Sequence, residues 1–166
     1  MNKPNFRTGI GYDLHRLEEN RDLIIGGIKI PYEKGLLGHS DADVLVHAII
    51  DALLGSLALP DIGTLFPDTD DKYKGADSIE LLKKVYSMVK GNGYLIGNLD
   101  TNIIAQAPKM MPYIPQMKEK LASVLEMDIN DLSIKAKTKE HLDAVGEKKA
   151  IEAQAVVLVY KNQIET

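Results

Sequence analysis

The sequence predicts one α+β domain: a two-layer sandwich in which helices cover one face of a mixed β-sheet. The order of patterns is the first reason, because strand-like segments come first, two helical segments follow, and strands then flank a third helix. The second reason is the length, because 166 residues suit a single compact domain. We therefore expect one domain over residues 1–166. No helical segment is left to cover the second face of the sheet, which favours an oligomer.

Strand patterns occur at both ends of the chain. Residues Phe6 to His15 form the first, and two short apolar runs within 22–30 are separated by Gly26-Gly27, a hairpin-turn signal. A loop is expected at 31–38. Later strands are expected at 94–107, 134–138 and 151–160, of which the last is apolar enough to be buried on both faces or at a subunit contact.

Three helices are predicted. Ser40 and Asp41 stand at an N-cap position before a segment with apolar residues at helical spacing, which continues to residue 59. Asp77 with Glu80 resembles a capping box, opening a helix that stops near Gly91. The third helix is expected at 113–126. The polar loop at 60–71 is long for a compact domain, and such loops are often functional.

Composition limits the possible functions. The chain has no cysteine, so any tight metal site must use His, Asp or Glu. The formal charge of −4 argues against a general nucleic-acid binder but allows a small anionic ligand. No run approaches the roughly 18 apolar residues of a membrane span, and the first residues lack a signal-peptide pattern. We therefore expect a cytoplasmic protein without a membrane partner.

Asp13, His15 and His47 are candidate metal ligands. Asp13 and His15 are two residues apart on a predicted strand, so their side chains point to the same face. His47 lies on the first predicted helix. A set of this type leaves the fourth tetrahedral position open, as a catalytic zinc requires, and an ion there can polarise a phosphoryl oxygen. The alternative for His47 is a hydrogen-bonded core histidine.

Further residues have the chemistry of an anion or sugar site. His39 and Ser40 precede a helix, where free N–H groups favour an anion, although His39 also fits a plain loop residue. In the long loop, Asp61 and Gly63 can hold sugar hydroxyls, and Asp68 with Asp70 can hold a polyol or a second ion. The alternative there is a solvated acidic loop.

Two later segments leave predicted strands. The small residues of 105–110 allow the backbone to approach a planar ligand, unless this is a plain strand-to-helix connection. In 135–140, Thr138 offers a hydroxyl to a phosphate, and Glu140 offers an oxygen ligand suited to Mg²⁺. The alternative is a solvated basic face.

Together these segments resemble the cyclodiphosphate synthase family of the non-mevalonate isoprenoid pathway. The matching stretches run from about Gly9 to Glu140 in family order: GYDLH, IGGIKIPYEKGLLGHSDADVLVHAIIDALLG, DIGTLFPDTD, KGADS, NIIAQAPKM and PQM. The resemblance implies an enzyme that converts 4-diphosphocytidyl-2-C-methyl-D-erythritol 2-phosphate to 2-C-methyl-D-erythritol 2,4-cyclodiphosphate and releases CMP. The 2-phosphate of the substrate attacks its β-phosphate. The implied assembly is a homotrimer with active sites at subunit interfaces.

The resemblance also assigns residues. It places Zn²⁺ on Asp13, His15 and His47, and a second ion, Mg²⁺ or Mn²⁺, between the substrate phosphates. It gives catalytic roles to His39, Thr138 and Glu140. The implied substrate contacts are Asp13, His15, His39, Ser40, Asp61, Ile62, Gly63, Phe66, Pro67, Asp68, Thr69, Asp70, Ala105, Gln106, Ala107, Pro108, Lys109, Met110, Lys137, Thr138, Lys139 and Glu140.

The match weakens after Glu140. Ala144 stands where phenylalanine is usual, Glu147 where arginine is usual, and Lys137 where threonine is common. In several family members that arginine lines a cavity on the trimer axis that can hold an isoprenoid diphosphate. Glu147 would repel such a ligand unless a neighbouring lysine turns inward.

Two other functions remain open at this point. A metal-dependent phosphoesterase would activate water at the open metal position, with Asp41 or His39 as the general base. A non-catalytic trimeric binding protein for isoprenoid diphosphates is the second, and the altered Ala144 and Glu147 argue against it.

Overall fold

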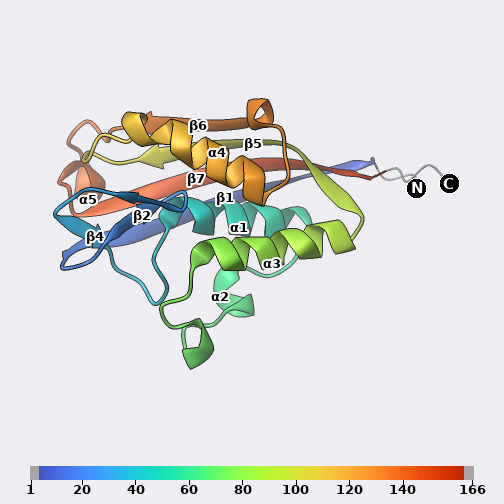
Figure 1. Ribbon diagram of the computed structural model, residues 1–166, viewed down its shortest axis with the longest axis horizontal. Helices are drawn as coiled ribbons and strands as arrows, with labels where there is room; N and C mark the ends of the chain where they lie inside the picture. The colour runs from blue at the N-terminus through green and yellow to red at the C-terminus, as the bar shows by residue number, and fades with distance from the viewer. Residues whose placement is uncertain (1–3, 163–166) are drawn as a thin grey trace.

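The computed structural model describes residues 4–162. Its main sheet has the strand order β4-β1-β7-β5-β6 (Figure 1). The pairs β1–β4, β1–β7 and β5–β7 are antiparallel, and β5–β6 is parallel, so the predicted mixed sheet is confirmed. The strands span β1 Phe6–Glu19, β4 Lys34–Leu36, β5 Tyr94–Ile104, β6 Leu132–Lys137 and β7 Ala150–Lys161.

A separate hairpin follows β1. Strands β2 (Leu23–Ile25) and β3 (Ile28–Ile30) pair around Gly26 and Gly27, as the glycine pair predicted. Both glycines have positive φ angles, 60° and 72°, a conformation that side chains disfavour.

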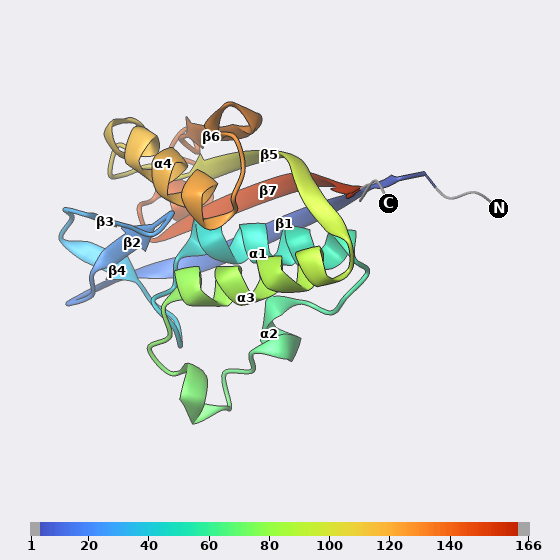
Figure 2. The same ribbon diagram turned by 45° about the vertical axis from the view of Figure 1, so that its right-hand side comes forward.

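The long helices lie on one face of the sheet. They are α1 (Val44–Ser56), α3 (Ser78–Gly91) and α4 (Ile114–Val124). Figures 1 and 2 show α1 directly against the strands, with α3 beside it. The predicted α+β class, with helices on one face of a mixed sheet, is therefore confirmed. Short turns complete the described chain: α2 Ile62–Leu65, α5 Asp143–Gly146, and the 3₁₀ turns Asp71–Tyr73, Met111–Tyr113 and Ile129–Asp131.

Two glycines bring α1 close to β1. A Cβ on Gly9 would lie 1.8 Å from the Ala52 oxygen, and a Cβ on Gly11 would lie 1.8 Å from the Ala48 oxygen. Because no side chain fits there, the helix backbone rests on the strand backbone. This close approach brings the start of α1 next to the middle of β1.

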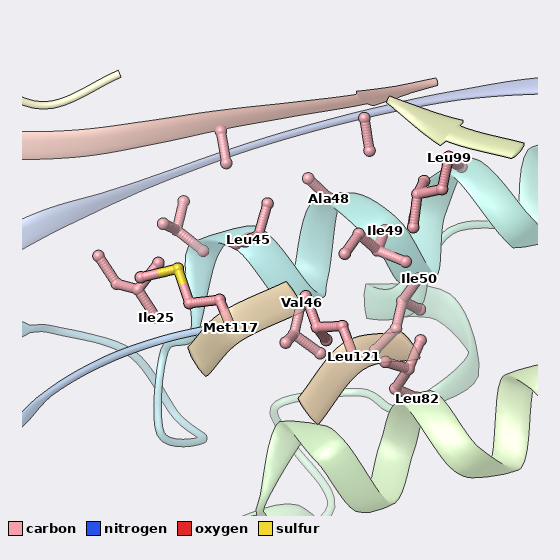
Figure 3. Close-up of a cluster of buried hydrophobic side chains, with 14 of the residues drawn as sticks. Ile25, Leu45, Val46, Ala48, Ile49, Ile50, Leu82, Leu99, Met117 and Leu121 are labelled. Atoms are coloured by element: carbon pink, nitrogen blue, oxygen red, sulfur yellow. The ribbon is translucent and has the colours of Figure 1, made fainter. Parts of the chain in front are cut away.

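The core surrounds α1. Figure 3 shows its apolar side chains between the sheet and the neighbouring helices, where they meet residues such as Leu82, Met117 and Leu121. These side chains are fully buried, and burying each contributes about 1.5–3 kcal/mol. A helix buried on nearly all sides is held in place by its packing, and so are the polar side chains that it carries.

The other face of the sheet is exposed and carries large apolar side chains on β1 and β7. Ile10 keeps 75% of its surface exposed, and Tyr12, Leu14 and Val156 keep about half of theirs. Nothing in residues 4–162 covers these side chains. None of the described helices is long and apolar enough to cross a membrane.

Several boundaries differ from the prediction. Residues 31–38 contain the short strand β4, and β1 continues to Glu19. The N-cap of α1 is Asp43, whose side chain accepts from the Val46 N–H, so Ser40 and Asp41 were wrong as caps.

The second helix and the strand after it also differ in detail. Asp77 caps α3 as predicted, but Glu80 pairs with Lys83. Strand β5 ends at Ile104 rather than at 107, and the peptide bond between Ala107 and Pro108 is cis.

Candidate active site

Asp13, His15 and His47 converge at the junction of β1 and α1. The Asp13 Oδ2 lies 2.8 Å from the His15 Nε2 and 3.0 Å from the His47 Nδ1. The two ring nitrogens lie 3.2 Å apart. Ligand atoms around a tetrahedral zinc, each about 2.0 Å from the ion, lie about 3.3 Å from one another. The three side chains thus have the spacing of one face of such a site.

The hydrogen bonds of His15 fix the state of its ring. The His15 Nδ1 lies 2.8 Å from the Leu37 carbonyl oxygen, which can only accept. In the neutral ring Nδ1 therefore carries the hydrogen, and the lone pair of Nε2 points at the Asp13 carboxylate. Lone pairs this close repel one another unless a cation or a proton lies between them. The donor set therefore fits a divalent ion.

The pKa values of Asp13 and His15 reflect the same proximity. Burial raises the pKa of Asp13, but hydrogen bonds and charge from His15 and His47 outweigh it and lower the pKa to about 2. Burial lowers the pKa of His15, and the Asp13 carboxylate outweighs that effect and raises it. Both shifts show that the Asp13 carboxylate favours positive charge at this point, which is the charge that a metal ion would supply.

A pocket opens beside these ligands. Nine of the predicted site residues line it: Asp13, His15, His39, Ser40, His47, Ile62, Gly63, Phe66 and Asp68. Gly38, Tyr73 and Leu81 complete its wall. His39 Nε2 is buried and has no hydrogen-bond partner among the described residues. A polar atom in that position is available to a ligand.

Arg21 holds the loop that carries His39 and Ser40. Its guanidinium donates to the Leu36 carbonyl at 2.6 Å and to the Ser40 carbonyl at 3.3 Å. These bonds hold the backbone of the loop, and the side chains of His39 and Ser40 line the pocket.

Four of the substrate contacts predicted in the acidic loop do not line this pocket: Asp61, Pro67, Thr69 and Asp70. Asp61 caps α2 and accepts from the backbone N–H and the hydroxyl of Thr64, which lowers its pKa. Asp70 caps the next 3₁₀ turn and pairs with Lys72. Hydrogen bonds from Lys72 lower the pKa of Asp70. Both carboxylates shape the loop locally.

A second pocket lies where β5 and β6 end. The predicted residues in its wall are Ala105, Gln106, Pro108, Lys109, Met110, Lys137 and Thr138, joined by Ala136, Met111 and Pro112. The Gln106 Oε1 accepts from the backbone N–H groups of Lys139 at 3.3 Å and of His141 at 3.1 Å. This side chain ties the two strand ends together. The wall is mostly apolar side chains and backbone, which suits a planar ring.

Ala107, Lys139 and Glu140 are not in the wall of the second pocket. The Lys139 amine pairs with the buried Glu152 and, at 3.4 Å, with Asp143, so that it is held by residues of this chain. Glu140 is exposed, and the Thr138 hydroxyl lies 3.4 Å from its carboxylate. Glu147 pairs with Lys149.

Two residues near the ligands were missed by sequence reasoning. Ser78 is fully buried, and its hydroxyl lies 2.9 Å from the His47 Nε2. Tyr73 lines the metal pocket and meets Phe66 edge to face. Tyr73 ends the 3₁₀ turn Asp71–Tyr73 and Ser78 begins α3, and neither position gave a sequence signal of the contacts near the ligands.

Comparisons with known proteins agree on one family. The model described as the YgbB family matches residues 6–160. A relative from Clostridioides difficile, named 2-C-methyl-D-erythritol 2,4-cyclodiphosphate synthase, is 57% identical over 153 residues, which is 92% of this chain and 95% of the relative. The chain therefore belongs to the YgbB family, and the predicted resemblance to cyclodiphosphate synthases and the prediction of an enzyme are confirmed.

Solved structures agree in fold. An IspF from Plasmodium falciparum, in a complex with CDP, has a TM-score of 0.85 and 37% identity over 98% of this chain and 100% of that one. The bifunctional IspDF from Campylobacter jejuni has a TM-score of 0.91 and 39% identity over 95% of this chain. This chain spans 42% of the length of that bifunctional protein.

Proposed function

We propose that the chain converts 4-diphosphocytidyl-2-C-methyl-D-erythritol 2-phosphate to 2-C-methyl-D-erythritol 2,4-cyclodiphosphate and CMP, as a step in isoprenoid precursor synthesis. The observation that carries this proposal is the convergence of Asp13, His15 and His47 beside His39 and Ser40. The names of the relatives support the same reaction.

The metal-side pocket would bind the reacting phosphates. A Zn²⁺ ion on Asp13, His15 and His47 would supply positive charge and polarise a phosphoryl oxygen. His39 and Ser40 line the same pocket and would donate hydrogen bonds to the 2-phosphate. The substrate carries its own nucleophile, so these residues need only position it and offset the repulsion between the two phosphates.

The second pocket would bind the cytidine. Small side chains and backbone groups of 105–110 would contact the cytosine ring, with Lys109 also in the wall. Thr138 and Lys137 would contact the diphosphate, and Glu140 would hold the second ion, Mg²⁺ or Mn²⁺. Phe66 to Asp70 and the turn at Asp61 would enclose the erythritol side.

We propose further that the active site is completed by a neighbouring copy in a homotrimer. The two pockets share no lining residue, although one substrate must reach both. The apolar residues Ile10, Tyr12, Leu14 and Val156 form an uncovered sheet face suited to contact between copies. The 166 residues act as one domain in this proposal.

A ³¹P NMR assay tests the reaction. Purified protein with Zn²⁺ and Mg²⁺ should form the cyclic diphosphate and CMP from the cytidyl substrate, and chelation should stop both. Linear phosphate products would instead identify a metal-dependent phosphoesterase. A folded, metal-loaded protein that leaves the substrate unchanged would refute the proposal. Tight binding of geranyl diphosphate by that protein would favour the binding-protein alternative.

A further inference from the structure

A chain of hydrogen bonds runs behind His47. The His47 Nε2 lies 2.9 Å from the Ser78 hydroxyl, which donates to the Asp41 Oδ1. The Ser78 backbone N–H donates to the Asp41 Oδ2 at 3.0 Å. The Asp41 backbone N–H in turn donates to the Ala76 carbonyl at 3.2 Å. These bonds lock the first turn of α3 onto the loop before α1.

The donors and acceptors in this chain allow one arrangement of hydrogens. An ionised Asp41 carboxylate can only accept, so the Ser78 hydroxyl must donate its hydrogen to it. Ser78 then offers only a lone pair to His47. The His47 Nε2 must therefore carry the hydrogen of this contact, and the lone pair of the neutral ring lies on Nδ1. That nitrogen faces Asp13 and His15.

We propose that Asp41 and Ser78 are positioning residues that set the tautomer and ring orientation of His47 for metal binding. The inference rests on the proposed metal site but not on the reaction performed there. Hydrogen bonds of this kind, from the far nitrogen of a ligating histidine to a buried acceptor, fix ring orientation and increase ligand basicity. Here the acceptor is the Ser78 hydroxyl, and the Asp41 carboxylate accepts in turn from that hydroxyl.

The same arrangement gives Ser40 a separate role. The Ser40 hydroxyl oxygen lies 3.2 Å from the His47 Nε2 and accepts from the Ala42 N–H at 3.2 Å. Because the His47 Nε2 is a donor, the hydrogen of the Ser40 hydroxyl is not used by His47. Ser40 can therefore donate that hydrogen to an anion in the pocket that it lines.

Zinc affinity tests this inference without measuring turnover. Zn²⁺ binding is measured by competition with a chromophoric chelator for the wild type, Ser78→Ala and Asp41→Asn. Ser56→Ala is the matched control, because Ser56 is also fully buried but donates to the Leu53 carbonyl at the far end of α1. Circular dichroism confirms that each variant is folded.

Ser78→Ala should weaken Zn²⁺ binding by about 10–100-fold, in the range typical for partners of metal ligands. Asp41→Asn should weaken it by a smaller factor, and Ser56→Ala should leave it unchanged. In zinc-loaded, ¹⁵N-labelled wild type, long-range ¹H–¹⁵N spectra should show the His47 hydrogen on Nε2.

The inference would be overturned if folded Ser78→Ala and Asp41→Asn bound Zn²⁺ as tightly as Ser56→Ala. It would also be overturned if the spectra showed the His47 hydrogen on Nδ1. Failure of the proposed reaction looks different. In that case wild-type protein would bind Zn²⁺ through His47 in the expected tautomer, respond to Ser78→Ala, and yet form no cyclic product.

Discussion

The pocket beside Asp13, His15 and His47 (the metal pocket) and the proposed nucleotide pocket at the ends of β5 and β6 are built from elements of opposite character. His47 lies on a helix buried on nearly all sides, and its partners Asp13 and His15 lie on the long strand beneath it. The nucleotide pocket is formed by strand ends and connections, where Lys137 and Thr138 are exposed. An ion requires ligand atoms placed within tenths of an ångström, whereas a planar ring can be held by backbone and small side chains. Substitutions in the two pockets should therefore fail in different ways.

The largest effect is expected from His47→Ala. It removes the ligand supplied by α1, and the loss of several kcal/mol of charge stabilisation lowers turnover roughly a thousandfold or more. Metal content should fall, while CDP binding and the size of the assembly should persist. Metal analysis, calorimetry with CDP and size-exclusion chromatography measure these properties. Full activity in a metal-containing His47→Ala protein would contradict the ligand assignment.

Gly11→Ala should damage the metal pocket from a distance. The new Cβ would lie 1.8 Å from the Ala48 oxygen, so α1 must move away from β1. We expect a loss of about 3 kcal/mol or more in the free energy of unfolding and weaker zinc binding. Urea unfolding at a fixed protein concentration and chelator competition measure the two effects. Wild-type stability in this variant would show that close contact between α1 and β1 is not required.

Gln106→Ala should affect only the nucleotide pocket. It removes the acceptor for the N–H groups of Lys139 and His141, which loosens the strand ends around the ring. We expect about tenfold weaker CDP binding, equivalent to the loss of about one hydrogen-bonded contact, with zinc content unchanged. Gln116→Ala, on the exposed face of α4, is the control for calorimetry. A drop in zinc content in Gln106→Ala would show that the two pockets are not separate.

The smallest effect is expected from Gly55→Ala, on the exposed side of α1. The nearest atom to its new Cβ would be the Ile10 oxygen at 3.8 Å, an ordinary contact. Alanine favours the helix over glycine, so stability should rise by about 0.5–1 kcal/mol. Urea unfolding of Gly55→Ala and Gly11→Ala under the same conditions measures the difference. If Gly55→Ala were also destabilised, α1 would tolerate an added methyl group on neither side.

The sequence predicted the long elements well, because their periodicity extends over many residues. The strand at Phe6 and the helix around His47 were both recognised, and the pairing of Asp13 with His15 followed from strand alternation. Some short elements, such as strand β4 and helix α5, were missed because three or four residues carry no period. Only the hairpin of β2 and β3, marked by Gly26-Gly27, was recognised from its turn.

The cap of α1 shows a second limit. The segment HSDADV offers several capping side chains, and tertiary contact selects among them. Asp43 is chosen because its carboxylate also accepts from the Gly26 N–H at 2.9 Å and the Gly27 N–H at 2.7 Å. This frees Asp41 to bind Ser78. Contacts between segments this far apart in the chain are not visible in local patterns.

The pocket residues show a third limit. The family resemblance predicts that Lys139 contacts the substrate, but no sequence pattern indicated that its amine pairs with the buried Glu152. Which face of the chain a side chain takes after a strand ends depends on the turn, and Glu140 and His141 both have positive φ angles there. Alternation therefore stops predicting direction at Lys137.

Mixing two inactive variants tests most directly the claim that each active site combines the metal pocket of one copy with the nucleotide pocket of another. His47→Ala lacks the metal ligand, and Glu140→Ala lacks the proposed ligand of the second ion. The two proteins are unfolded together, refolded as a mixture and assayed by ³¹P NMR. If neighbouring copies share the site, random trimers should regain about a quarter of wild-type activity, because one site in four joins two intact halves. No recovery in correctly assembled mixed trimers would place both halves of the site in one chain and contradict the account.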